Sequence, residues 1–196
     1  MTSQVFWFTA RASGIVAWGL AAASVVWGLA LSTRLLGRRP RPAWLLDLHR
    51  FLGGLALGFT GVHVLAVLAD SYVHFSLVNV LVPLTGDWHP LAVAWGVAGM
   101  YLLLAVELTS LARPRVPRRL WRRVHYAGFA VYLMTTVHGL TAGTDGRSPA
   151  FLAANAVVAA LVAGLTASRV AAAAGAPATA PAGRPGGSAR QAALRG

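Results

Sequence analysis

Five long apolar segments dominate this chain of 196 residues. A helix that crosses the hydrocarbon core of a bilayer needs roughly 20 mostly apolar residues, and each segment has that length. Only 11% of the residues are charged, whereas soluble domains contain about 25%. The sequence therefore predicts an all-α integral membrane protein, a bundle of five transmembrane helices. The segments lie between Arg11 and Arg34, from about Ala43 to Ala69, from Trp88 to about Leu111, from about Leu120 to Gly143, and from about Pro149 to Ser168.

The basic residues indicate the orientation of this bundle. All 17 are arginines, and they gather in the connection after the first segment and in the connection before the fourth, with more in the tail. The connection from Asp70 to Trp88 has none. Because cytoplasmic loops are enriched in arginine, we expect the N-terminus outside and the C-terminus in the cytoplasm of a multi-pass protein of the cell membrane. The net charge of +12 then reflects the topology and not nucleic-acid binding. The expected partner of the apolar segments is membrane lipid.

We expect one membrane domain over residues 8–170 and a disordered tail, rich in Ala, Pro, Gly and Arg, over residues 171–196. The first segment lacks a basic region before it and is too long for a signal peptide, so it is predicted to be a retained helix. A short helix at the membrane surface would suit the partly apolar outer loop. Pro114 and Pro117 predict a break before the fourth helix. The chain has no cysteine, which excludes disulfides and iron–sulfur clusters, and no nucleotide-binding fingerprint.

Four of the six histidines lie on two predicted helices: His49 and His63 on the second, His125 and His138 on the fourth. Both helices enter from the cytoplasmic side, so one histidine of each lies near the inner end and the other roughly 20 Å further out. Any one of them could simply be an interhelical hydrogen-bond partner. Four at two matched depths are better explained by pairs of imidazoles that clamp the iron of a planar macrocycle from both sides. The other two, His74 and His89, belong to the outer loop, where a solvated histidine is ordinary.

Helix geometry supports one half of this arrangement better than the other. At about 100° per residue, His63 lies only ~40° around the helix from His49. His138 lies about 140° from His125 on an ideal helix, so the fourth helix has to be overwound, bent or steeply crossed. Gly128 and the pair Thr135–Thr136 are the places where we expect it to deform.

Two further groups of residues have two interpretations. Glycines on the same helices suit close helix packing, and they also suit the edge of a macrocycle; they are Gly53, Gly54, Gly58, Gly61, Gly128 and Gly139. Arginines at the inner end are topology determinants, and one or two of them, Arg50 and Arg122 foremost, are candidates to pair with the propionates of an inner haem. The remaining arginines of this cluster are Arg118, Arg119 and Arg123.

The spacings His49-X13-His63 and His125-X12-His138 resemble those of the ferric reductase-like transmembrane domain, shared by ferric reductases and NADPH oxidases, over about residues 10–145. The resemblance implies two haem b groups, an inner one held by His49 and His125 and an outer one held by His63 and His138. The stretches "HRFLG" and "RRLWRRVHY" are also similar to the haem-binding membrane subunit of the bacterial methionine-sulfoxide reductase system. That subfamily usually has arginine where this chain has His49.

These observations predict an oxidoreductase component that carries electrons across the membrane, from a separate flavoprotein or a quinol to an unknown outer acceptor. One alternative is a haem subunit that serves a separate exported oxidoreductase. Another is a transporter that uses the histidines as a proton or metal relay, which would call for acidic partners. Glu107 is the only acidic residue within a span when the second span is counted from its uncharged stretch after Arg50. A structural haem protein is the third.

Overall fold

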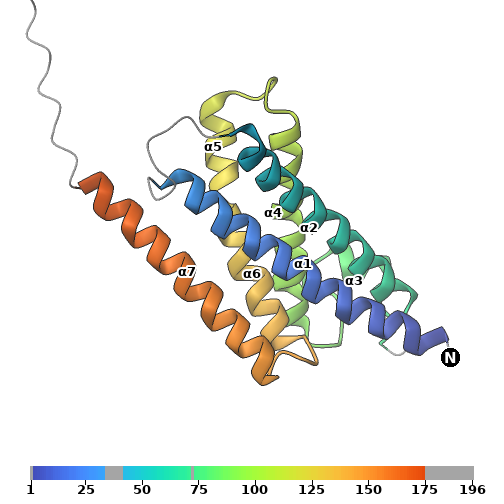
Figure 1. Ribbon diagram of the computed structural model, residues 1–196. Coiled ribbons are helices and arrows are strands. Elements are labelled where there is room, and N and C mark those ends of the chain that lie inside the picture. The colour runs from blue at the N-terminus through green and yellow to red at the C-terminus, as the bar shows by residue number, and fades with distance from the viewer. Residues whose placement is uncertain (1, 34–41, 72, 175–196) are drawn as a thin grey trace, which may run out of the picture.

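The computed structural model describes residues 2–33, 42–71 and 73–174, and all regular structure in these ranges is helical (Figure 1). The prediction of an all-α protein is therefore confirmed for the described part of the chain. The helices are α1 (Thr2–Ser32), α2 (Ala43–Ala69), α3 (Leu77–Leu81), α4 (Pro90–Leu111), α5 (Arg118–Tyr126), α6 (Gly128–Thr141) and α7 (Pro149–Ala174).

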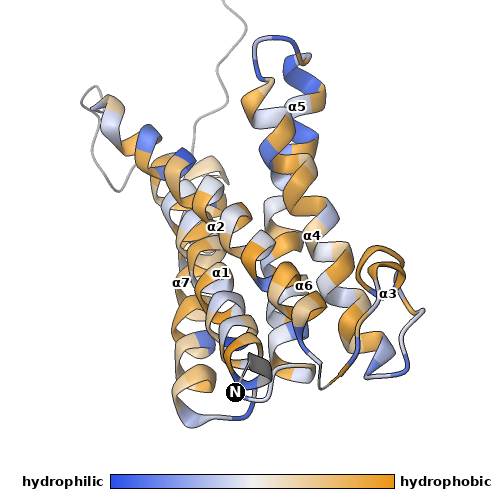
Figure 2. Cartoon of the chain, turned by 90° about the vertical axis from the view of Figure 1, so that its right-hand side faces the viewer, coloured by the Kyte–Doolittle hydropathy of each residue, from blue (hydrophilic) through white to orange (hydrophobic). Residues whose placement is uncertain are grey.

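Four of these helices are long and apolar enough to cross a membrane, namely α1 over Gln4–Ser32, α2, α4 and α7. The predicted fourth span falls on α5 and α6, and neither has the required length by itself. Large apolar side chains face outward along the bundle, among them Leu65 at 67% and Leu111 at 77% exposure (Figure 2). Such a surface is suited to lipid, so this is a helical membrane protein. The count of five spans and their orientation stay predictions.

Prolines set several helix boundaries. Pro42 precedes α2, Pro90 begins α4 and Pro117 precedes α5, as expected for a residue whose missing N–H and fixed φ suit the start of a helix. The break predicted at Pro114 and Pro117 is thus present. The short helix predicted in the outer loop is α3, and Ser76 and Asn79 cap it reciprocally through side chain and backbone.

Helices α1 and α2 run antiparallel and pack most extensively, while α4 packs mainly against α6, and α1 also contacts α6 and α7 (Figure 1). Buried alanines, such as Ala22 of α1 and Ala56 of α2, allow this close approach. Within the described residues, the backbones of α2 and of α5–α6 scarcely approach one another.

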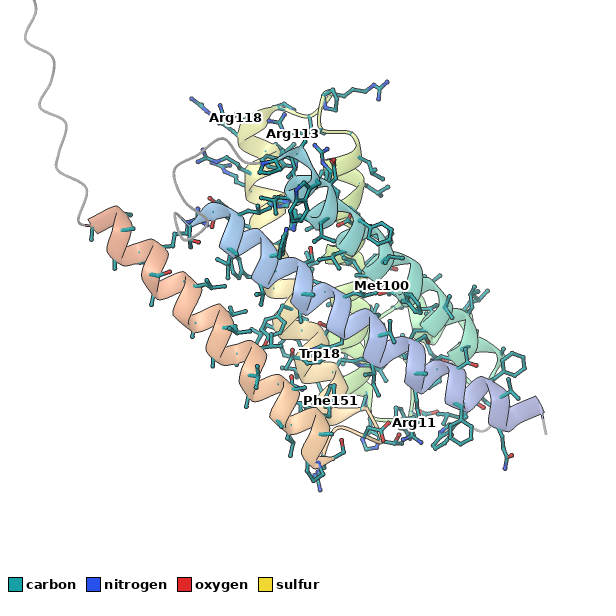
Figure 3. All side chains as sticks on the ribbon, in the orientation of Figure 1. Arg11, Trp18, Met100, Arg113, Arg118 and Phe151 are labelled. Carbon is teal, nitrogen blue, oxygen red and sulfur yellow. The ribbon has the colours of Figure 1, made fainter. Side chains whose placement is uncertain are left out.

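One end of the bundle is rich in arginine, since α5 alone carries four of these residues. Arg113 and Arg118 lie at one end, together with the C-terminal end of α7, and Arg11 lies toward the opposite end (Figures 1 and 3). Arg169 of α7 donates to the hydroxyl of Tyr126 on α5 (3.4 Å), which joins two elements of the arginine-rich end. The arginines between residues 34 and 41 lie outside the described residues.

The predicted boundary between membrane domain and tail falls inside a helix. Helix α7 continues to Ala174, so the first residues assigned to a disordered tail are helical. The rest of that predicted tail, residues 175–196, lies outside the described residues.

Candidate functional site

The four histidines singled out from the sequence come together in two pairs. His49 of α2 lies beside His125 of α5, with 5.8 Å between ring centres and 80° between ring planes. His63 of α2 lies beside His138 of α6, with 6.2 Å between ring centres and 78° between planes. This is the pairing that the resemblance implies, one residue from each helix at each of two depths. His74 and His89 are exposed and belong to neither pair.

A tightened turn lies between His125 of α5 and His138 of α6. The N–H of Ala127 donates to the carbonyl of Val124 (2.9 Å), three residues back instead of four. Such a turn advances about 120° per residue instead of 100°. The expected deformation therefore occurs next to Gly128. At the other expected place, Thr135–Thr136, helix α6 continues without a break.

Three of the four imidazoles are held through Nδ1 by a backbone carbonyl of a neighbouring helix. His63 donates to Ala10 of α1 (2.7 Å), His49 to Ser24 of α1 (3.1 Å), and His138 to Ala92 of α4 (2.8 Å). Because a carbonyl oxygen only accepts, Nδ1 carries the proton in each case and Nε2 keeps its lone pair. That is the tautomer in which Nε2 binds a metal, and a hydrogen bond of this kind fixes the orientation of the ring.

His125 is held differently from the other three. Its Nδ1 is buried and has no hydrogen-bond partner among the described residues. Its ring stacks on the indole of Trp121, one helical turn earlier in α5, with 4.9 Å between centres and 19° between planes. Arg113, which belongs to the α4–α5 turn, places its guanidinium 4.7 Å from the centre of that indole. Stacking thus fixes the ring of His125 without fixing its tautomer.

A cavity of about 260 Å³ adjoins the outer pair. His63 and His138 line it, together with small and apolar side chains of α1, α2, α4 and α6. Arg11 and Asp145 also line it and form an ion pair, with Nε 2.9 Å from Oδ2, that ties α1 to the α6–α7 turn. His63 and His138 therefore border an apolar cavity that is also lined by the Arg11–Asp145 ion pair.

The hydrogen bonds of the four imidazole rings involve none of the arginines and glycines singled out from the sequence, all of which lie within the described residues. Arg50 forms an exposed ion pair with Asp47 (3.2 Å), and Arg122 is exposed on α5. Gly53 faces the carboxylate of Glu107. Gly139 faces the ring of Phe151, whereas a Cβ at Gly54, Gly58, Gly61 or Gly128 would meet nothing within 4 Å. Close helix packing accounts for Gly53 and Gly139.

The histidine pairs fit haem iron by their spacing and chemistry. Two imidazoles that share one metal through bonds of about 2 Å, each with its ring centre roughly 1 Å beyond the nitrogen, have ring centres roughly 6 Å apart. The two observed spacings, 5.8 Å and 6.2 Å, agree with this. Neutral imidazoles with a free Nε2 are ordinary axial ligands of haem. That these residues bind haem stays a prediction.

The fold and the two tiers of facing histidines define a helical membrane protein with an internal histidine site. The chain belongs to the ferric reductase-like transmembrane family, because the family model described as "Ferric reductase like transmembrane component" matches residues 13–136. The family suggested by the sequence is therefore confirmed, and the protein is a membrane electron-transfer component. The match includes His49, His63 and His125 and ends two residues before His138. Neither the curated proteins nor the solved structures yielded a match.

The sequence did not reveal the partners of the imidazoles. The carbonyls of Ala10 and Ala92 carry no side-chain signature, since every residue has a carbonyl. Ser24 is different, because its hydroxyl oxygen also lies 3.3 Å from Nδ1 of His49. Trp121 was within reach of sequence reasoning, because it precedes His125 by four positions and side chains so spaced meet on a helix.

Proposed function

We propose that this protein is a di-haem b electron-transfer protein of the cell membrane. It passes electrons from a cytoplasmic or quinol donor to an acceptor outside. The observation that carries the proposal is the presence of two imidazole pairs, at two depths, each with its ring centres about 6 Å apart. In this reading His49 and His125 hold the inner haem, and His63 and His138 hold the outer one.

Haem bound at these pairs supplies one-electron redox chemistry at two depths. With a histidine on each side, as His49 and His125 or His63 and His138 would provide, a bound haem iron would have no free position for a substrate, so both sites would be suited to carrying electrons. The carbonyls of Ala10, Ser24 and Ala92 orient three of the rings. The apolar helices around them exclude water and so help to set the reduction potentials.

The arginine-rich end that contains Arg113 and Arg118 is the cytoplasmic end in this proposal. The inner pair then lies toward the electron donor, which we take to be a separate flavoprotein or a membrane quinol. Arg50 and Arg122 at that end are proposed to pair with haem propionates. The outer pair and its cavity lie toward the acceptor.

The visible spectrum of the purified protein before and after reduction with dithionite tests this function. We expect a b-type α-band in the reduced state and two haems per chain. His63→Ala is expected to remove the outer haem and to leave the inner one. His74→Asn is the matched control, because it changes an exposed histidine at φ 41°, a conformation that asparagine tolerates. A colourless protein with ample haem supply would overturn the proposal, and full retention of haem in His63→Ala would overturn the ligand assignment.

A further inference from the structure

Each hydrogen-bonded imidazole lies directly on a glycine of a neighbouring helix. A Cβ built at Gly14 or Gly96 would come closer than 3.0 Å to the ring, a distance that real Cβ atoms essentially never show. A Cβ built at Gly28 would lie 3.0 Å from the ring, which is tighter than nine in ten real Cβ contacts. The closest distances are 2.9 Å from Gly14 to His63, 3.0 Å from Gly28 to His49, and 2.8 Å from Gly96 to His138. The other glycine on α1 within the described residues, Gly19, has no such neighbour within 4 Å.

The carbonyl that accepts from each ring belongs to the residue four positions before that glycine. The combinations are Ala10 with Gly14, Ser24 with Gly28, and Ala92 with Gly96. In an α-helix the side chain at position i lies next to the carbonyl of i−4, which is why serine and threonine can donate back to it. A glycine at position i leaves that carbonyl uncovered. The ring can then rest on the glycine and donate Nδ1–H to the carbonyl; we call this unit a glycine socket.

The sockets on α1 have the same spacing as the histidines on α2. Gly14 and Gly28 are fourteen positions apart, as are His49 and His63. Since the two helices run antiparallel (Figure 1), the outer histidine meets the first glycine and the inner histidine meets the second. Two glycines on α1, at the same spacing as the histidines of α2, thus supply a socket for each of those histidines.

The fourth histidine has no socket, and the sequence of α4 supplies a reason. Gly96 lies against His138, and His125 precedes His138 by thirteen positions. Thirteen positions after Gly96 in the antiparallel helix α4 stands Thr109, whose hydroxyl donates to the carbonyl of Ala105 four residues back (2.7 Å). The side chain of Thr109 therefore covers the carbonyl that a glycine at this position would leave open. This agrees with the unpartnered Nδ1 of His125 and its stacking on Trp121.

We propose that Gly14, Gly28 and Gly96 are positioning residues that fix the orientation and the Nδ1–H tautomer of three haem-binding histidines. This inference rests on the proposed function, because it assigns to the glycines a role in holding ligands for haem. The outer pair has two sockets and the inner pair has one. Substitution at Gly14 or Gly96 therefore acts on the outer haem, and substitution at Gly28 acts on the inner one.

The test compares Gly14→Ala, Gly28→Ala and Gly96→Ala with the control Gly19→Ala in the full-length membrane protein. Three quantities are measured: haem per chain, the rate of haem transfer to excess apomyoglobin, and the EPR spectrum with the reduction potential of each haem. Loss of a partner that orients a metal-binding histidine typically weakens the site about 10–100-fold. We expect haem to leave the affected site at least about 10-fold faster, with a changed EPR signal and potential for that haem alone.

The EPR signal and the reduction potential that disappear in His63→Ala are those of the outer haem. If Gly14→Ala does not accumulate, Gly96→Ala tests the same pair from another helix. Socket variants that match Gly19→Ala in haem transfer, EPR signal and potential would overturn the inference while the proposed function stands. A wild-type protein without haem would instead overturn the proposed function.

Discussion

The hydrogen bond between Trp18 of α1 and Thr136 of α6 provides a test of the bundle that does not depend on haem. The indole Nε1 donates to the threonine hydroxyl (2.9 Å), and Trp18 is only 8% exposed. The ring of Trp18 also contacts Phe151 of α7, with 4.9 Å between centres, and both residues lie between these helices in Figure 3. Thr136→Val preserves the shape of the side chain and removes the acceptor.

The expected cost follows from the burial of the indole. Side-chain hydrogen bonds between membrane helices contribute about 0.6 kcal/mol on average and about 1.7 kcal/mol at most. A buried donor left without a partner costs about 1–3 kcal/mol. Because Trp18 remains in place and loses its acceptor, we expect Thr136→Val to lower the free energy of unfolding by about 1–2 kcal/mol, a factor of roughly 5–30 in the unfolding equilibrium.

The neighbouring residue supplies a matched control. Thr135 donates its hydroxyl within its own helix, to Val131, so Thr135→Val removes no contact between helices and is expected to cost less than about 0.5 kcal/mol. Both variants are unfolded reversibly in mixed micelles by titration with sodium dodecyl sulfate and followed by circular dichroism. Combining Thr136→Val with Trp18→Phe in a double-mutant cycle isolates the interaction. Equal stability of the two threonine variants, or a coupling energy near zero, would refute the reasoning.

Three other predictions concern the site and the orientation. In both pairs the ring planes are nearly perpendicular, at 80° and 78°. Because crossed imidazole planes leave two of the iron d orbitals nearly degenerate, both haems should give strongly anisotropic low-spin EPR signals. Two ordinary rhombic signals would contradict the geometry. Trp121→Leu removes the planar face on which His125 stacks, a contact worth about 0.5–1.5 kcal/mol. We expect up to roughly tenfold faster transfer of the inner haem to apomyoglobin, with the outer haem unchanged. Equal loss of both haems would argue against a role of Trp121 at the inner pair. Because the chain has no cysteine, single cysteines report its orientation: a membrane-impermeant maleimide applied to intact cells should label Asp87→Cys and leave Arg115→Cys unlabelled, and the opposite pattern would invert the proposed topology.

Much of the fold could be predicted because the relevant physics is local. Apolar length sets where helices cross lipid, and the predicted second span, Ala43–Ala69, coincides with α2. Proline at position 117 marks the start of α5 for the same kind of reason. The angular mismatch between His125 and His138 predicted a deformation, but the tightened turn at Ala127 became visible only in three dimensions.

The sequence by itself determined that four imidazoles lie at two depths, because the cost of placing ionisable groups in hydrocarbon and the rise of a helix are properties of single segments. Only the tertiary structure decided which atoms hold those imidazoles. Every residue has a carbonyl, so the choice of Ala10, Ser24 and Ala92 depends on the register between neighbouring helices and on the glycines that leave those carbonyls uncovered. For the same reason the sequence did not show that Nδ1 of His125 lacks a partner among the described residues, since this too depends on the register between neighbouring helices.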